Sequence, residues 1–279
     1  MQRVQPEISA IILNYKNPQL TAKCVEVLTR SLEECGASSQ IIVVDNSAAE
    51  TAGELRRRLP EAVEIIENPE NRGFARATNQ GIRAGRGEYI LLLNNDVFVN
   101  SQCLKTGLDY VKEHPQTGIW APQLIGGDGR PQVSCARFPS LKSAFGEYLL
   151  GKQWNWYGDL FEWKEPRAVE TVNGAFNLVP QPVFDQAGWL DEDFFFTGED
   201  LDFCKRLNQH GFAVIYDPRC RATHLGGASQ APGKWFRDPY LHRHLILYYR
   251  KHHRGFTAAC SAMIIHLGLL LRRVLAPLK

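Results

Sequence analysis

The feature that most constrains this chain is an alternation of short apolar runs with helical stretches over its first hundred residues. Helical patterns occupy 19–32, 55–59 and 75–84. The apolar runs between them predict four strands that are buried on both faces, at 8–13, 41–44, 63–66 and 89–93. Because a strand–helix–strand order makes successive strands parallel, the sequence predicts a doubly wound α/β fold, with a mostly parallel central sheet and helices on both faces.

Beyond about residue 115 the pattern is less regular. Residues 171–179 and 213–216 predict two more strands, and 199–210 predicts a helix that ends at Gly211. The stretch 137–168 is rich in aromatic side chains, which we expect to form core or a lid, with a substrate-facing surface as the alternative. Those aromatic residues are Trp154, Trp156, Tyr157, Phe161 and Trp163. No change in composition marks a domain boundary before residue 238.

Charge is placed unevenly along the 279 residues, whose net charge is +2. No acidic residue follows Asp238, and residues 1–238 carry 25 basic against 30 acidic residues, a net charge of −5. A nucleic-acid-binding protein would carry its basic patch on the body, so we expect no nucleic-acid partner. The seven cysteines show no paired spacing, and residues 1–7 show no apolar signal region, so we expect reduced thiols and no export.

The basic C-terminal segment contains an apolar run at 256–271, shorter than the about 20 residues that a membrane crossing needs. Helical spacing puts one apolar face on Phe256, Cys260, Met263, Ile264, Leu267, Leu271 and Val274. Ser261, Gly268 and Arg272 fall toward the other side. We therefore expect an amphipathic helix lying in a membrane interface, flanked by Arg250, Lys251, Arg254, Arg272 and Arg273. The alternative is a helix that packs on the body or on a second subunit.

Polar side chains follow all four predicted strands, at the edge where open parallel sheets bind ligands. They are Asn14, Asp45, residues 68–73 and Asn94-Asn95-Asp96. No Gly-rich phosphate loop is present, which makes nicotinamide dehydrogenases and P-loop nucleotidases poor candidates. A phosphate site of this kind commonly needs a divalent cation, and Asp96 is well placed to bind Mg²⁺ or Mn²⁺.

Three acids, at 199, 200 and 202, open the helix predicted over 199–210. Acids in a first helical turn commonly do no more than complement the helix dipole, worth about 0.3–1 kcal/mol each. Three exceed what capping needs. A carboxylate here could instead serve as a general base.

Several motifs together resemble family 2 glycosyltransferases, most closely the rhamnosyltransferase-like subset of bacterial surface-polysaccharide assembly. They are Asn14-Tyr15, Asp45-Asn46-Ser47, the segment 71–81, Asn94-Asn95-Asp96 and the segment 198–207. The resemblance covers roughly 8–225. It implies a GT-A fold, with a donor-binding part over about 1–115, an acceptor and catalytic part over about 116–238, and a helical tail over 239–279.

The activity that the resemblance implies is inverting transfer of a sugar from a nucleoside-diphosphate donor, dTDP-rhamnose first and UDP-sugars second. The acceptor would be a glycan or a polyprenyl-linked glycan precursor at the inner face of the cytoplasmic membrane. A sugar nucleotidyltransferase is one alternative, although it would need a Gly-rich, Arg-bearing loop where this chain has Asn14-Tyr-Lys-Asn-Pro. A non-catalytic glycan-binding or scaffold relative is the other alternative.

The resemblance also implies roles for individual residues. Asp45 would hold the nucleotide base, and the full set of donor-binding residues would be Asn14, Asp45, Arg72, Gly73, Asn79, Asn94 and Asn95. Asp96 and His224 would hold a divalent cation, Mn²⁺ or Mg²⁺, with Asn94 standing where the family often has a first Asp. Asp200 would be the general base, beside Glu199.

Overall fold

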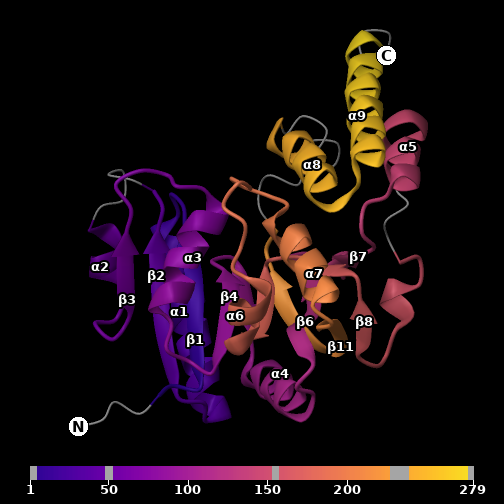
Figure 1. The fold of residues 1–279 in the computed structure, drawn as a ribbon. Coiled ribbons are helices and arrows are strands. Elements are labelled where there is room, and N and C mark those ends of the chain that lie inside the picture. Colours follow the sequence, from indigo (N-terminus) through magenta and orange to yellow (C-terminus); the bar gives the residue numbers. More distant parts are fainter. Residues whose placement is uncertain (1–4, 48–52, 153–156, 227–238, 276–279) are drawn as a thin grey trace.

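The computed structural model describes residues 5–47, 53–152, 157–226 and 239–275 (Figure 1). Its first part follows the predicted alternation: β1 (Ile8–Asn14), α1 (Pro18–Cys35), β2 (Ser39–Asp45), α2 (Glu54–Arg58), β3 (Glu64–Glu67), α3 (Phe74–Ala84) and β4 (Tyr89–Asn94). The next elements are β5 (Val97–Val99), α4 (Ser101–Glu113), β6 (Thr117–Ile125), β7 (Cys135–Ala136), α5 (Leu141–Leu150) and the 3₁₀ turn η2 (Leu160–Glu162). They are followed by β8 (Arg167–Val169), β9 (Thr171–Val172), β10 (Phe176–Pro180), α6 (Pro182–Ala187), α7 (Glu199–Gln209), β11 (Ala213–His224), α8 (Pro239–His252) and α9 (Gly255–Leu275).

The described strands form a central nine-stranded sheet, ordered β3-β2-β1-β4-β10-β6-β11-β5, with β8 beside β11, and a small β7–β9 pair. Strands β3, β2, β1 and β4 are parallel neighbours, as are β6 and β11. Strand β10 enters antiparallel between β4 and β6, and β5 and β8 are antiparallel to β11. The predicted α/β fold with a mostly parallel sheet is confirmed, with antiparallel strands inserted in its second half.

Two predicted strands have different bounds in the structure. The strand expected over 171–179 is two strands, because the backbone turns at Asn173-Gly174, where the Gly174 N–H donates to Asp200. The strand expected over 213–216 continues to His224 because its last residues pair with β5. Both differences depend on partners distant in sequence, which a local pattern does not reveal.

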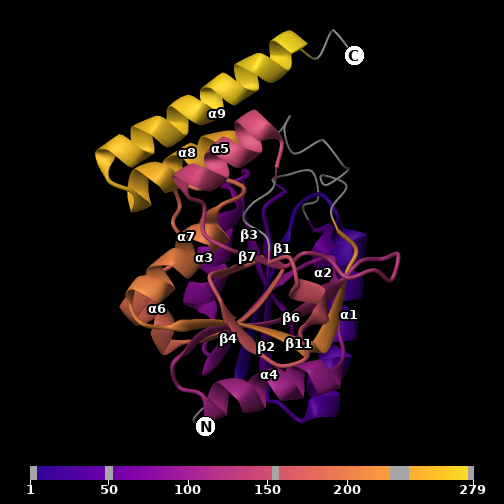
Figure 2. The ribbon, with the colours of Figure 1, turned by 90° about the vertical axis from the view of Figure 1, so that its right-hand side faces the viewer.

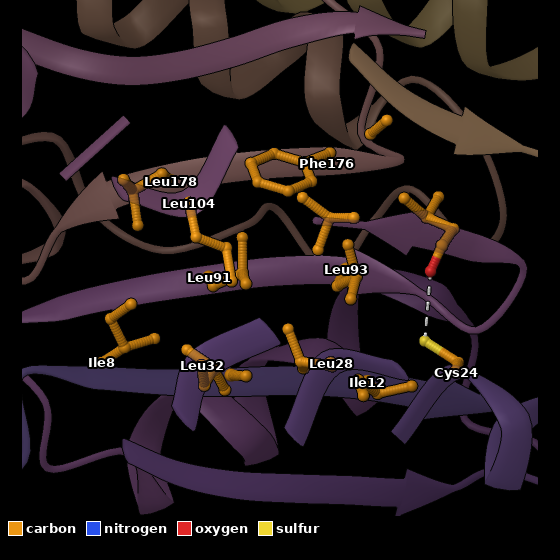
Figure 3. Packing of buried hydrophobic residues seen from close by; sticks show 14 of the residues in the cluster. Ile8, Ile12, Cys24, Leu28, Leu32, Leu91, Leu93, Leu104, Phe176 and Leu178 are labelled. Atoms are coloured by element: carbon orange, nitrogen blue, oxygen red, sulfur yellow. Dashed lines mark hydrogen bonds between the residues drawn. The ribbon is translucent and has the colours of Figure 1, made fainter. Parts of the chain in front are cut away.

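Helices cover both faces of the sheet. Residues of α1 and α4 share one buried cluster with β1 and β4, whereas α3, α6 and α7 contribute to a second cluster on the other face. Figure 3 shows Leu28 and Leu32 of α1 packed against β1 and β4. Full burial of each leucine contributes about 1.5–3 kcal/mol. The Cys24 thiol of α1 donates to the carbonyls of Asn94 and Val97, and thereby holds the turn between β4 and β5.

The aromatic-rich stretch contributes to the core. Trp163 is 8% exposed and contacts the rings of Tyr157 and Tyr216. Trp154 and Trp156 lie outside the described residues. All seven cysteines are free thiols, as expected.

The C-terminal helices pack on α5, a helix contributed by the body (Figures 1 and 2). Their shared cluster consists of Ala144, Tyr148, Ile246, Tyr249, Ala258 and Ile265. Gly268 allows α9 to approach closely, since a Cβ there would lie 2.6 Å from the carbonyl oxygen of Tyr148. Figure 2 shows α9 running across α5 and α8 at one end of the molecule.

One face of α9 is buried against α5 and α8, and another is exposed and apolar. The buried face includes Ser261 and Gly268, so the side expected to be polar is the one that contacts the body. The exposed face includes Phe256, Met263, Leu267, Leu270 and Leu271, between 43% and 81% exposed. The amphipathic prediction thus holds for the exposed face. The packing alternative holds for the opposite one.

Candidate active site

A cavity of about 340 Å³ opens at the carboxyl ends of β1 and β4, where the strand order predicts a ligand site. It is lined by Leu13, Tyr15, Asn46, Asn71, Gly73, Phe74, Asn94, Asn95, Asp96, Asn173, Gly174, Phe195, Phe196, Thr197, Glu199, Asp200 and His224. Of the predicted site residues, the structure brings together Gly73, Asn94, Asn95, Asp96, Glu199, Asp200 and His224. Asn14, Asp45, Arg72 and Asn79 lie outside this lining.

Asp96 and His224 meet because β5 pairs antiparallel with the end of β11. His224 stands opposite Val97, and the Leu225 N–H donates to the Asp96 carbonyl. The Nε2 atom of His224 lies 3.5 Å from Oδ1 of Asp96. Gln132 fixes the imidazole, because its Oε1 lies 2.8 Å from Nδ1 and its Nε2 donates to the His224 carbonyl. A proton on Nδ1 therefore leaves the Nε2 lone pair directed toward Asp96.

The pair fits a divalent cation shared with a substrate. Burial lowers the pKa of His224 despite the nearby Asp96 carboxylate, so the imidazole is neutral near pH 7. Neutral imidazole and carboxylate are ligands for Mn²⁺. No group of three or more His, Cys, Asp or Glu among the described residues could hold a metal. Further ligands would therefore come from water and the donor diphosphate.

Asp200 lies at the start of α7, with its carboxylate held by two backbone groups. Gly174 N–H donates to Oδ2 at 3.0 Å, and Leu201 N–H donates to Oδ1 at 2.7 Å. Burial raises the pKa of Asp200 above its ordinary value, and these two hydrogen bonds partly offset the rise. A carboxylate with a raised pKa that lines a cavity is suited to accept a proton.

The neighbouring acids have different surroundings. The Oε2 atom of Glu199 has no hydrogen-bond partner among the described residues. Burial and the charge of Asp200 raise the pKa of Glu199 well above its ordinary value, which favours the neutral acid. Burial alone would raise the pKa of Asp202, but hydrogen bonds from His252 and Arg206 lower it, so Asp202 is a structural anion.

A buried network lies behind the cavity. The Asn14 amide donates to Asp45 Oδ1 and to the Ser47 hydroxyl, and Asn14 Oδ1 accepts from Thr21. The Asn95 amide also donates to Thr21. Asn14 and Asp45 are 0% and 3% exposed. The network thus links the ends of β1, β2 and β4, and the donor-binding roles of Asn14 and Asp45 stay predictions.

A second network orders the segment before α3. Asn46 Oδ1 accepts from the Arg72 N–H, and the Asn46 amide donates to Asn71 Oδ1 and to the Gly73 carbonyl. The Arg72 side chain is exposed. Asn79, by contrast, is buried and bonds the backbone of Leu190 in both directions, so it ties α3 to that loop. The donor-binding roles of Arg72 and Asn79 stay predictions.

Sequence reasoning assigned no role to several lining residues. Asn46 and Asn71 lie within the quoted motifs but were not singled out, although asparagine after a buried strand was a usable signal. Phe195 and Phe196 also line the cavity. Their signal was available too, since three consecutive phenylalanines precede the acid pair in the sequence.

Comparison with known proteins gives consistent matches. The profile described as Glycosyl transferase family 2 matches residues 9–159. The low-salt glycan biosynthesis hexosyltransferase Agl10 of Haloferax volcanii is 25% identical over 225 residues, 76% of this chain and 65% of that relative. This chain thus spans just under two thirds of that relative's length.

Two solved structures are similar to the fold. GalNAc-T7 with UDP, GalNAc and Mn²⁺ has a TM-score of 0.63 at 14% identity, covering 89% of this chain and 48% of that one. The mannosyltransferase PcManGT from Pyrobaculum calidifontis, in complex with GDP-Man and Mn²⁺, has a TM-score of 0.61 at 16% identity. That match covers 97% of this chain and 76% of the mannosyltransferase. Both support the GT-A type of fold.

Proposed function

Because the chain belongs to glycosyl transferase family 2, we propose that it is a metal-dependent, inverting hexosyltransferase that uses a nucleoside-diphosphate sugar. The observation that supports this best is a single cavity lined by Asp96, His224 and Asp200. Cation ligands and a candidate base then face the same substrate space. The activity named for the Haloferax relative is of the same class.

In the proposed reaction the acceptor hydroxyl oxygen attacks the anomeric carbon from the side opposite the diphosphate. The new C–O bond forms as the bond to the diphosphate oxygen breaks, and that electron pair leaves with the nucleoside diphosphate. The hydroxyl proton passes to the Asp200 carboxylate, which Gly174 and Leu201 hold in place. A cation held by Asp96 and His224 would stabilise the negative charge that develops on the diphosphate.

The proposed donor is dTDP-rhamnose first and a UDP-sugar second. The support is the similarity of the sequence motifs to the rhamnosyltransferase-like subset. Of the two similar structures, GalNAc-T7 contains UDP and the mannosyltransferase contains GDP-Man. Calorimetric titration with dTDP, UDP and GDP tests the nucleotide, and a preference for GDP would contradict both choices.

Release of nucleoside diphosphate by the purified chain tests the reaction, with Mn²⁺, Mg²⁺ or a strong chelator present. Asp200→Asn should lower turnover at least ~10²-fold while donor binding changes little, because the shape is kept and the proton acceptor is lost. Asp128→Asn, at an exposed turn, is the matched control. Full activity in chelator would remove the metal. Donor binding without any turnover would favour the non-catalytic alternative.

We further propose that α9 docks on the inner face of the cytoplasmic membrane, so that the cavity reaches a polyprenyl-linked acceptor. Among the described residues, α9 alone is long and apolar enough to cross a membrane, with a mean hydropathy of 1.5 over Gly255–Arg273. The helix has 21 residues, so the expectation that the segment is too short to cross was wrong. What supports an interfacial position is packing, because a crossing helix would have to leave α5 and α8.

The flanking cations divide into two groups. Lys251 bonds Asp191 and Asp193, and Arg272 donates to the Glu147 and Tyr148 carbonyls, so both are used within the fold. Arg250, Arg254 and Arg273 are exposed. Each would add about 1 kcal/mol of attraction to anionic lipid.

Co-sedimentation of the full chain with anionic vesicles tests this docking. Met263→Asp and Leu270→Asp change residues that are 63% and 58% exposed, and should each reduce binding in a background that high salt also weakens. Phe161→Asp alters an equally apolar, 46% exposed side chain outside the tail and should bind normally. Equal binding of all four proteins would assign the exposed face to another partner.

A further inference from the structure

Three aromatic side chains form an exposed surface beside the cavity. Phe195 and Phe196 line the cavity and are 37% and 49% exposed, although Phe194 next to them is fully buried. Tyr240 of α8 is 42% exposed and stacks on Phe195, with ring centroids 5.5 Å apart and an interplanar angle of 22°. It also contacts the Phe196 ring edge to face at 6.5 Å. The three rings are called the aromatic platform below.

The backbone beneath the platform is fixed from both sides. The Phe74 N–H donates to the Phe195 carbonyl at 2.6 Å, and the Phe195 N–H donates to His244 Nε2 at 3.3 Å. Lys251 of α8 bonds both Asp191 and Asp193, at the start of the same loop. A loop held in this way presents aromatic surface to water at a cost of about 1.5–3 kcal/mol for each side chain that could have been buried. Such an exposed apolar patch marks a binding surface.

The rest of the lining indicates what binds there. Five asparagines line the cavity: Asn46, Asn71, Asn94, Asn95 and Asn173. The described lining contains one aliphatic side chain, Leu13, so it lacks the continuous hydrocarbon surface that a lipid chain would need. A pyranose ring offers an apolar C–H face and a rim of hydroxyl groups. An aromatic ring packs against the first, and amides hydrogen-bond the second.

The platform also lies on the side of the candidate base. Its loop passes through Thr197 and Gly198 directly into Glu199 and Asp200, and Gly198 adopts a φ of +94° with the Phe194 ring close by. A ring held against Phe196 would therefore lie next to the carboxylate proposed to take the proton.

We infer that Phe195, Phe196 and Tyr240 form an acceptor subsite that binds a saccharide ring, so that the reactive hydroxyl belongs to a sugar and not to a lipid phosphate. This inference rests on the proposed function and specifies its acceptor class. The platform residues bind and position the acceptor. They take no part in the proton transfer.

Acceptor kinetics test the subsite, with octyl pyranosides as saccharide probes and octyl phosphate as the lipid-phosphate probe. Tyr240→Ala and Phe196→Ala should each raise KM for the accepted octyl pyranoside at least ~10-fold, whereas the calorimetric Kd for the nucleoside diphosphate stays within about two-fold. Tyr240→Phe keeps a flat ring and should restore a KM near that of the wild type. Phe161→Ala removes an equally exposed ring outside the cavity and serves as the matched control. Melting temperatures establish that each variant is folded.

Two results would overturn the inference: an unchanged acceptor KM in both alanine variants, or octyl phosphate accepted as well as every pyranoside. Failure of the wild-type chain to release nucleoside diphosphate from any donor would instead contradict the proposed function. In that case saturation-transfer NMR still reports binding of the octyl pyranosides. Loss of that signal in Tyr240→Ala would support the subsite, and its persistence would overturn it.

Discussion

Replacing Gly73 by alanine should destabilise the protein by two separate effects. Gly73 adopts φ +83° and ψ 165°, a conformation that is open to glycine and costs other residues about 1–3 kcal/mol. The added Cβ would also lie 2.6 Å from the Phe195 carbonyl oxygen and 2.8 Å from its ring. Relief of such overpacking typically costs about 1–3 kcal/mol. The sum is about 2–6 kcal/mol, much of it spent on moving the aromatic loop.

Gly129→Ala separates the two effects. Gly129 also has a positive φ, +77°, but a Cβ there meets no atom within 4 Å, so it carries backbone strain of about 1–2 kcal/mol and no clash. Thermal and denaturant unfolding of both variants measures the difference, and acceptor KM should rise in Gly73→Ala alone. If the two variants lose equal stability and keep the same KM, the close approach of Gly73 to Phe195 does not constrain the loop.

Three further outcomes follow from buried polar groups. Burial raises the pKa of Glu147 to about 7 although Arg272 nearby lowers it, so the folded state holds this proton more tightly than the unfolded chain. The wild type should therefore lose stability as pH rises from about 4.5 to about 7, by up to ~3 kcal/mol, and Glu147→Gln should not, as melting temperatures across that range will show. Gln132→Leu, which releases the His224 ring, should weaken Mn²⁺-dependent donor binding about 10–100-fold by calorimetry, and an unchanged Mn²⁺ dependence would contradict the orienting role. His252→Leu leaves one buried Asp202 oxygen without its donor and should lower the free energy of unfolding by about 1–3 kcal/mol, whereas an unchanged denaturant midpoint would show that water replaces the imidazole.

Local pattern was sufficient for the first half of the fold. Strands β1 to β4 are continuous apolar runs, and the polar residues that follow them do gather at one edge, which is why Asp96 was placed correctly beside the cavity. Distant partners decided the rest. The turn at Gly174 forms around the Asp200 carboxylate, and β11 reaches His224 by pairing with β5.

The same limit applies to the helical end of the molecule. Apolar periodicity found the exposed face of α9, but Gly268 reads as a neutral residue until the Tyr148 backbone is seen against it. The clamp that α8 exerts on the aromatic loop, through His244 and Lys251, joins residues about fifty positions apart. No spacing rule within one element could reveal it.

The thiol of Cys24 makes the site report on its own opening. Burial raises the pKa of Cys24 to about 12, so in the closed structure it is neither ionised nor accessible to alkylating reagents. Its bonds to Asn94 and Val97 join α1 to the turn that carries Asp96. Alkylation of this cysteine then requires α1 to separate from that turn, and its rate, followed by peptide mass spectrometry, measures how often the cation-binding end of the sheet comes apart. A nucleotide that binds only the closed form would slow the labelling of Cys24 and leave that of the more exposed Cys35 unchanged.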